Sequence, residues 1–325
     1  MVAGTAFVIS CLGTRALIGL LRRGAVLDLP NERSLHVAPT PRGGGIAVIG
    51  VSVIAWLALC AVGILPPGEI VVALGAAGLG LVSWLDDLRG LPPGLRLLAQ
   101  FVAVAAGIWA LPHGALFQGW LPLSLDTVAG ALVWVWFVNL FNFMDGIDGI
   151  AGSEAAAIGI GIVLVASREL NLAAPAAAIA AAALGFLVWN WAPARIFLGD
   201  VGSVPLGYLL GFLLYELALR SRAGMIGAWQ AALILPAYFL ADASLTLLRR
   251  LLRGERVWQA HREHFYQRAV QRGLSHDAVV LRMIAADIVL IACALAAAQG
   301  WEFVALAVAV LTVVALLVEL GRNAR

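Results

Sequence analysis

The chain contains no lysine, and charged residues of every kind make up only 12% of its 325 residues. Soluble domains usually contain about 25% charged residues, so this composition excludes an ordinary water-exposed surface. The formal net charge is only +2, which gives no electrostatic reason to expect a nucleic-acid partner.

Cysteine is also scarce, and the three residues Cys11, Cys60 and Cys293 lie far apart. An odd number of widely spaced cysteines supplies neither a disulfide framework nor a thiolate metal site. Because each cysteine falls within an apolar segment, we expect all three to act as small packing residues. The sequence also lacks internal repeats, a low-complexity tail and a soluble second domain. We therefore expect residues 1–325 to form a single domain.

Apolar residues are abundant instead, at 62% of the chain, and the mean hydropathy is +0.96. A bilayer absorbs this much apolar surface, and about 20 mainly apolar residues make a helix long enough to cross it. The sequence predicts an all-α, polytopic integral membrane protein with about eleven transmembrane helices. The expected spans are residues 2–21, 43–64, 68–85, 95–112, 123–141, 151–167, 173–191, 203–220, 227–247, 278–298 and 301–320.

The distribution of arginine predicts the orientation in the membrane. With an odd number of spans, an outside N-terminus and a cytoplasmic C-terminus place most arginines in the cytoplasm, as the positive-inside rule requires. The exceptions are Arg15, Arg168, Arg220 and Arg222. No basic region precedes the first apolar segment, so we expect an anchor there and not a cleaved signal peptide.

Almost all remaining polar residues fall in five connections on the predicted cytoplasmic face. These connections are residues 22–42, 86–94, 142–150, 192–202 and 248–277. The external connections are short and carry little chemistry. Five polar loops on one face predict one site there.

Acidic residues stand at the ends of three predicted spans. Asp86 and Asp87 are adjacent. Two carboxylates at a membrane boundary repel each other, so we expect a cation or a proton to lie between them. The alternative is that the pair only marks the end of a span. Asp145 and Asp148 follow the fifth span, where they suit a metal, phosphate or nucleoside site or a solvated turn. Asp200 begins the eighth span, where it could also simply cap a helix.

Basic residues complete the set. His261 and His264 are three residues apart, so in a helix they share one face and can bind a metal or phosphate oxygens. Arginine makes bidentate contacts with phosphate, although the run at 249–256 could also serve only to hold anionic lipid headgroups. A site that holds a divalent cation and a diphosphate is expected to contain both carboxylates and arginines. Phosphoryl transfer mainly needs alignment of the substrates and neutralisation of their charge, which this set of residues could supply.

Five motifs, in this order, resemble those of the polyprenyl-phosphate N-acetylhexosamine-1-phosphate transferases, the glycosyl transferase family 4 membrane proteins. They are Asp28–His36 with Pro39–Gly44, Asp86-Asp87, Asn142–Gly149, Phe197–Ser203 and His261–His264. The resemblance extends from Asp28 to about Gln267. It implies transfer of a sugar-1-phosphate from a UDP-sugar to undecaprenyl phosphate, with release of UMP.

The resemblance also implies roles for individual residues. Asp86 and Asp87 would be the catalytic pair, while Asp200 would be the principal ligand of Mg²⁺, with Mn²⁺ as an alternative cation, and Asn142 a second ligand. The implied substrate-binding residues are Asn31, Arg33, His36, Arg42, Asp145, Asp148, His261, Arg262 and His264. The five polar loops would together form this active site at the cytoplasmic face of a multi-pass protein in the bacterial inner membrane. Membrane lipids would surround it, and a homodimer is an allowed state.

The last motif departs from one branch of the family. The phospho-N-acetylmuramoyl-pentapeptide transferases have three consecutive histidines there, whereas this chain reads His261-Arg-Glu-His264-Phe-Tyr-Gln. The pattern looks more like members that begin O-antigen or related surface glycans, some of which use 6-deoxy-N-acetylhexosamines. The pentapeptide transferase stays an alternative within the family.

A polytopic transporter is the alternative from another class. Transporter sites usually lie near the bilayer midplane within internal repeats, whereas most acids here stand at span ends. Asp242 and Asp287 are the exceptions, because they fall inside predicted spans.

Overall fold

A computed structural model describes residues 2–29, 38–112, 114–256 and 261–322. This part of the chain is almost entirely helical, as predicted, with one short pair of strands. The elements are α1 (Val2–Arg23), β1 (Leu27–Asp28), β2 (Thr40–Pro41), α2 (Gly45–Ala61), the 3₁₀ turn η1 (Pro67–Glu69), α3 (Ile70–Arg89), α4 (Pro93–Ala110), α5 (Leu123–Phe143), α6 (Ile150–Val165), α7 (Leu170–Asn190), α8 (Asp200–Arg220), α9 (Ala228–Ile234), α10 (Ala237–Leu252), α11 (Phe265–Gln271), α12 (His276–Ala297) and α13 (Glu302–Gly321).

Each of the eleven expected spans coincides with a helix or, for residues 227–247, with the pair α9 and α10. Within the described residues, eight helices are long and apolar enough to cross a membrane, or nine if α9 and α10 form one span bent by 58°. The expected number of eleven is therefore not confirmed. The difference lies in α2 and α6, which have 17 and 16 residues and are shorter than a typical spanning helix.

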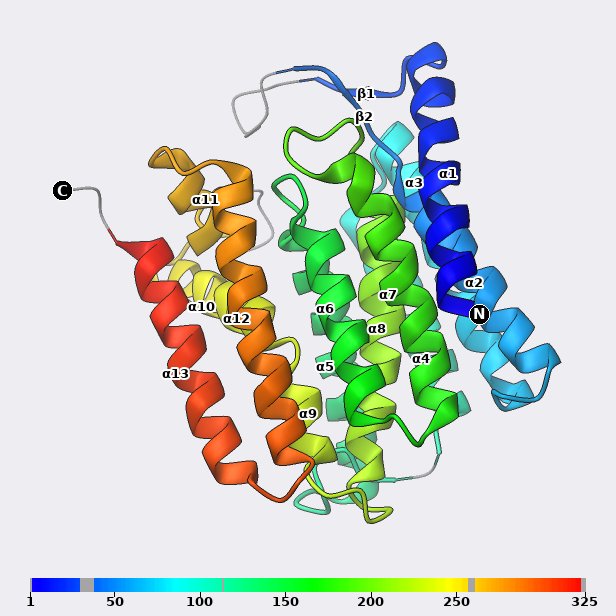
Figure 1. Ribbon diagram of the computed structural model, residues 1–325, viewed down its shortest axis with the longest axis vertical. Helices are drawn as coiled ribbons and strands as arrows, with labels where there is room; N and C mark the ends of the chain where they lie inside the picture. The colour runs from blue at the N-terminus through cyan, green and yellow to red at the C-terminus, as the bar shows by residue number, and fades with distance from the viewer. Residues whose placement is uncertain (1, 30–37, 113, 257–260, 323–325) are drawn as a thin grey trace.

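Helix α8 forms the centre of the bundle, with α2, α3, α5 and α9 packed around it (Figure 1). Residues 201–219 of this helix are all buried. A helix that is apolar on every side belongs in an interior, and α8 accordingly has little amphipathic character. The N-terminal end of α8 therefore provides a fixed point for the loops around it.

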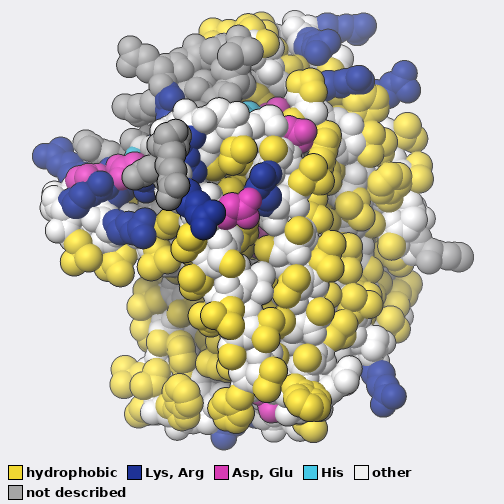
Figure 2. Space-filling view, turned by 60° about the vertical axis from the view of Figure 1, so that its left-hand side comes forward, with side chains coloured by type: hydrophobic (Ala, Val, Ile, Leu, Met, Phe, Trp, Pro, Cys, Tyr) yellow, Lys and Arg dark blue, Asp and Glu magenta, His cyan; other side chains and the backbone are white. Residues whose placement is uncertain are grey.

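The surface separates into an apolar band and a charged end. Figure 2 shows charged side chains gathered toward one end of the molecule, above a broad hydrophobic surface. Large apolar side chains such as Ile54, Leu132 and Leu311 are exposed on this surface at 68%, 53% and 68%. Such exposure is costly in water and favourable in lipid, so the surface agrees with the apolar helices in identifying a multi-pass membrane protein.

A contact between glycines links the segment after β2 to the start of α8. The Gly45 N–H donates to the Leu198 carbonyl at 2.9 Å. A Cβ atom on Gly45 would lie only 2.2 Å from the Gly202 Cα atom, so this approach of α2 to α8 needs glycine. The contact carries Arg42, three residues before Gly45, to Asp200 at the first turn of α8.

Candidate active site

Arg42 lies between two carboxylates from different helices. Its Nη2 atom is 2.8 Å from Asp87 Oδ1 at the end of α3 and 2.8 Å from Asp200 Oδ1 at the start of α8. The contact with Asp200 has hydrogen-bond geometry. Burial alone would lower the pKa of Arg42, but Asp200 and Asp87 outweigh it and raise that pKa. One guanidinium group thus joins two of the acidic motifs.

Asp87 also contacts the N-terminus of α8. Its Oδ2 atom accepts a hydrogen bond from the Val201 N–H at 3.2 Å, and its side chain is only 3% exposed. The first N–H groups of a helix lack partners within the helix and favour a negative charge. Gly199 permits this approach, because it has a φ of 75° and a Cβ atom there would lie 3.0 Å from Asp87 Oδ2. Asp87 is therefore fixed by a helix end and a cation together.

Asp86 faces a different set of partners. Its Oδ1 atom accepts from the Leu91 N–H at 2.6 Å, and its Oδ2 atom lies 2.8 Å from Arg96 Nη1 in the first turn of α4. The same Arg96 atom is 4.0 Å from Asp200 Oδ2. Adjacent carboxylates thus have separate environments, since Asp86 closes the loop between α3 and α4 while Asp87 faces α8.

Asn142 and Asp145 approach the same region from the end of α5. The Ser203 hydroxyl in α8 donates to Asn142 Oδ1 at 2.6 Å. Loss of hydration, reinforced by the charges of Asp200 and Asp87 and opposed by Arg42, raises the pKa of Asp145 to about 7. A positive charge that entered the site would lower this pKa and favour the ionised form of Asp145.

Asp148 joins three segments of the fold. Its Oδ2 atom accepts from the Ala194 N–H at 3.0 Å and lies 3.3 Å from His276 Nδ1 at the start of α12. The next residue, Gly149, donates its N–H to Asn190 Oδ1. The geometry thus gives Asp148 partners that hold the loop between α5 and α6 in place.

The last polar loop is anchored by a buried acid in α10. Asp242 Oδ1 accepts from the Phe265 N–H at 3.0 Å and lies 3.1 Å from His264 Nδ1. Its Oδ2 atom accepts from the Tyr266 N–H at 3.3 Å, and the Tyr266 hydroxyl donates to the Phe143 carbonyl in α5. These bonds place the His264 segment beside the end of α5, which carries Asn142.

His261 and Arg262 complete this loop. The His261 ring lies 4.9 Å from the His264 ring, centroid to centroid. Burial, with contributions from His264 and Arg250, lowers the pKa of His261 from 6.5 to about 4. The Nη2 atom of Arg262 is buried without a hydrogen-bond partner among the described residues. His261 is thus neutral at pH 7, and Arg262 has donor capacity to spare.

The lowered pKa of His261 predicts a pH effect on stability. Between pH 6.5 and 4 the unfolded chain binds a proton that the folded chain does not, so this histidine's contribution is fully present above pH 6.5 and is lost as pH falls toward 4. In the His261→Gln variant, we expect the unfolding temperature to fall less between pH 7 and 5 than in the unmodified protein. Thermal unfolding in detergent measures the difference, and equal falls in both proteins would contradict the prediction.

A pocket opens directly on Arg42 and Asp87. It has a volume of about 260 Å³ and is lined by Arg42, Asp87 and the β1 segment at residues 26–29. The network of Arg42, Asp87 and Asp200 is therefore accessible to a ligand. Of the predicted substrate-binding residues, Asn31, Arg33 and His36 lie outside the described residues.

The donor chemistry fits a divalent cation. Mg²⁺ prefers carboxylate and amide oxygens, which Asp87, Asp200 and Asn142 provide. Asp87 Oδ1 is buried and has no hydrogen bond, although Arg42 lies beside it. Within the described residues, no three acidic, histidine or cysteine side chains are gathered closely enough to form a complete metal centre. A cation in this region would therefore compete with Arg42 for the carboxylates.

Some residues of this network were not predicted from the sequence. Arg96, His276 and Ser203 contact predicted site residues, but none was expected to do so as a site residue. Asp242 was noted only as an acid inside a span. Its position about two turns before the basic run of α10 gave no sign that it would hold the His264 loop. The roles predicted for Asp86, Asp87, Asp200 and Asn142 remain predictions.

Comparison with known proteins identifies the family. The sequence model of glycosyl transferase family 4 matches residues 69–218. The phospho-N-acetylmuramoyl-pentapeptide-transferase of Mycobacterium sp. (strain JLS) is 30% identical, over 86% of this chain and 90% of the relative. The chain belongs to glycosyl transferase family 4.

Other family 4 relatives carry different names at similar identity. A probable undecaprenyl-phosphate N-acetylglucosaminyl 1-phosphate transferase of Bacillus subtilis (strain 168) is 27% identical, over 85% of this chain and 79% of its own length. The decaprenyl-phosphate N-acetylglucosaminephosphotransferase of Mycobacterium tuberculosis (strain ATCC 25618 / H37Rv) is 28% identical, over 86% and 78%. Membership in family 4 thus agrees with the resemblance found in the motifs, and the relatives differ in the sugar that they are named for.

Proposed function

We propose that this chain transfers a sugar-1-phosphate from a UDP-sugar to a polyprenyl phosphate such as undecaprenyl phosphate, and releases UMP. The observation that carries the proposal is Arg42, which bridges Asp87 and Asp200 at a pocket of about 260 Å³. A guanidinium group placed between carboxylates can turn to bind phosphate oxygens once a ligand enters. Relatives named as polyprenyl-phosphate transferases support the same reaction.

The reaction exchanges one phosphorus–oxygen bond for another. An oxygen of the carrier phosphate attacks the β-phosphorus of the UDP-sugar, and the bond from that phosphorus to the bridging oxygen breaks. The electron pair leaves with UMP, and the sugar-1-phosphate becomes part of a lipid diphosphate. Such a transfer needs alignment and charge neutralisation more than covalent help from the protein.

Asp87 is the residue best placed to take a proton from the carrier phosphate. The Val201 N–H of α8 donates to its Oδ2 atom, whereas its Oδ1 atom lies beside Arg42 without a hydrogen bond and can accept a proton once Arg42 turns toward a substrate phosphate. Asp86 would act through Arg96 and the loop at Leu91, as a positioning residue. Arg42, together with Arg262 from the His264 loop, would bind phosphate oxygens of the donor.

A divalent cation completes the charge balance. Within the described residues, the five carboxylates of Asp86, Asp87, Asp145, Asp148 and Asp200 outnumber the two arginines that pair with them, Arg42 and Arg96, and both substrates bring further negative charge. We propose that Asp200 and Asn142 hold Mg²⁺, or Mn²⁺ in its place. When bound, the cation would neutralise charge on the transferred phosphoryl group.

The donor is proposed to carry an N-acetylhexosamine or a 6-deoxy-N-acetylhexosamine. The sequence from His261 to His264 lacks the three consecutive histidines of the pentapeptide transferases, which argues against a muramyl-pentapeptide donor. The assignment to O-antigen or a related surface glycan stays a prediction.

An apolar cavity offers a place for part of the prenyl chain. It has a volume of about 190 Å³ and is bounded by Trp134 and Phe137 of α5, Trp229 of α9, and Pro236 and Leu240. Aromatic and aliphatic walls inside the membrane suit a long hydrocarbon chain. We propose that the carrier's tail enters here while its phosphate group reaches Asp87.

The orientation is part of the same proposal. If α2 and α6 cross the membrane as well, the protein has eleven spans, an outside N-terminus and its active site on the cytoplasmic face of the bacterial inner membrane. Helix α6 is nearly enclosed by its neighbours, which lets a short helix remain at membrane depth. The excess of arginine at the end that bears the site supports this orientation.

A reconstituted assay tests the function. We expect the purified protein to release UMP from UDP-N-acetylglucosamine only when undecaprenyl phosphate and Mg²⁺ are both present. The Asp200→Asn variant should need at least about tenfold more Mg²⁺ for half-maximal rate, since even supporting residues of metal sites commonly change affinity by about 10–100-fold.

The matched control is Asp277→Asn, which removes the same charge from a partly exposed position at the start of α12. This control should keep the Mg²⁺ dependence of the unmodified protein. Release of UMP that needs no lipid acceptor, or an unchanged Mg²⁺ requirement in Asp200→Asn, would refute the corresponding part of the proposal.

A further inference from the structure

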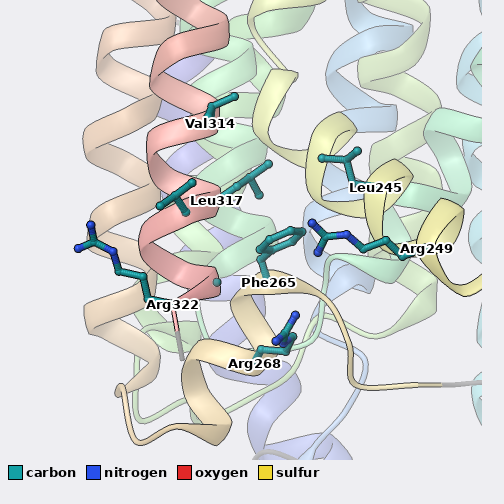
Figure 3. A pocket seen from close by; sticks show the side chains of 9 residues that line it. Leu245, Arg249, Phe265, Arg268, Val314, Leu317 and Arg322 are labelled. Carbon is teal, nitrogen blue, oxygen red and sulfur yellow. The ribbon is translucent and has the colours of Figure 1, made fainter. Parts of the chain in front are cut away.

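A second pocket lies apart from the candidate active site, between α10, α11 and α13 (Figure 3). Its volume is about 530 Å³. Leu245 of α10, Phe265 of α11 and Val314 and Leu317 of α13 give it an apolar wall. None of its lining residues comes from the helices that carry Asp86, Asp87 and Asp200. This pocket is therefore separate from the candidate active site.

Three arginines border this apolar wall. Arg249, Arg268 and Arg322 all line the pocket, and the Arg249 guanidinium lies 4.6 Å from the centroid of the Phe265 ring. Within the described residues, none of the three forms an ion pair with a carboxylate. Nearby Arg253, in contrast, is paired with glutamates. The border of the pocket thus carries positive charge that no carboxylate of the described residues pairs with.

The pocket stands at the level where membrane helices end. Helix α13, one of the spanning helices, ends at Gly321, and α10 leaves the line of α9 at a bend of 58°. Outward-facing side chains remain strongly apolar up to this level, since Leu252 is 78% exposed and Val318 is 52% exposed. The end of the pocket at Val314 and Leu245 thus lies within the hydrocarbon layer, while the arginines lie where lipid headgroups would be.

We propose that this pocket binds an anionic phospholipid, with its phosphodiester held by Arg249 and Arg268 and the part of its acyl chains nearest the headgroup packed against Leu245 and Leu317. The apolar wall would give a free phosphate ion no stabilisation, and a neutral lipid would leave the arginines uncompensated. The bound molecule is a fixed lipid and not the carrier substrate, because this pocket shares no lining residue with the pocket at Arg42 and Asp87.

Occupancy of the pocket has a consequence for the active site. Phe265 lines the pocket, directly follows His264, and donates its N–H to Asp242. A lipid that packs on Phe265 and joins α10 to α13 therefore holds the His264 loop in place. This consequence for turnover rests on the proposed transferase function, whereas lipid binding does not.

Binding can be measured directly by native mass spectrometry or by fluorescence titration of the purified protein. The probes are dioleoyl phosphatidylglycerol, dioleoyl phosphatidylcholine, inorganic phosphate and undecaprenyl phosphate. An arginine near a membrane surface contributes about fivefold to anionic lipid affinity, so we expect the double variant Arg249→Gln/Arg268→Gln to bind phosphatidylglycerol about 25-fold more weakly.

Two further variants make the test specific. Arg22→Gln/Arg23→Gln removes two exposed arginines at the end of α1, across the bundle, and should leave the affinity for phosphatidylglycerol within about twofold. Val314→Trp keeps every charge but fills the pocket, and should weaken phosphatidylglycerol binding while any weak binding of inorganic phosphate stays the same.

Three results would overturn the lipid assignment. Equal binding of phosphatidylcholine would show a groove without charge selectivity, and equal binding of inorganic phosphate would show an anion site without a lipid chain. Undecaprenyl phosphate displacing phosphatidylglycerol one for one at lower concentration would make the pocket part of the carrier site. Failure of UMP release with selective lipid binding intact would overturn the proposed function and leave this inference standing.

Discussion

The Asp87→Asn variant should lose about two to four orders of magnitude in kcat, the range typical of a removed general acid or base. Asparagine keeps the shape of the side chain and can still accept from the Val201 N–H. It cannot accept a proton from the carrier phosphate, and it removes the charge that orients Arg42. UMP release at saturating Mg²⁺ measures the effect, with UDP-sugar binding measured separately and expected to change much less.

Two comparisons show whether the loss belongs to Asp87 itself. Asp86→Asn should reduce turnover less, because Asp86 contacts Arg96 and a loop amide on the other side of the α3 terminus. Glu319→Gln removes an exposed carboxylate paired with Arg282 and should leave turnover unchanged. Near-normal transfer by Asp87→Asn would mean that the acidic pair only ends a span, and that the mechanism proposed here is wrong.

The second large effect is expected at Asp242. In Asp242→Asn, the amide group keeps one acceptor oxygen, whereas the carboxylate meets donors from His264, Phe265 and Tyr266. A buried donor left without a partner costs about 1–3 kcal/mol, so at least one lost bond should both lower stability and release the His264 loop. We expect kcat/KM to fall about 100-fold, since a small displacement of positioned groups can have that effect.

Asp126→Asn is the matched control for this prediction. Asp126 is likewise buried and accepts from two backbone amides, those of Leu116 and Phe117, at the end of the bundle away from the candidate site. We expect the two variants to lose similar thermal stability, while only Asp242→Asn loses activity per folded molecule. If both variants keep the same kcat/KM, Asp242 is a structural residue without influence on the site.

The sequence contained enough information for the type of fold but not for the number of spans. Apolar windows located every long helix, because about 20 apolar residues in a row leave few alternatives. Windows drawn over α2 and α6 also included loop residues, such as Gly43 and Gly44, which the structure places in the approach to α2. Hydropathy averages over such residues and so cannot separate a full span from a shorter buried helix.

The candidate site was predictable as a set of residues and not as a network of contacts. Motif order indicated that Asp87, Asp200 and Arg42 belong to one site, and the structure does bring these three together. The partnership of Asp242 with His264 depends on how α10 packs after its bend, which local sequence does not determine. Asp242 was one of the two acids inside predicted spans that a transporter could use. In the structure, its contacts with His264, Phe265 and Tyr266 give it a structural role beside the His264 loop.

Because α10 is bent away from α9, we expect the rate of the proposed transfer to depend on bilayer thickness. Helix α10 departs by 58° from α9, so its outward leucines, including Leu248 and Leu251, fix its depth relative to the hydrocarbon boundary. Thinning or thickening the bilayer changes that depth at a modest energetic cost. Because Asp242 joins α10 to the His264 loop, a change in the tilt of α10 should move His264, and we expect turnover to vary with the acyl-chain length of the surrounding lipid.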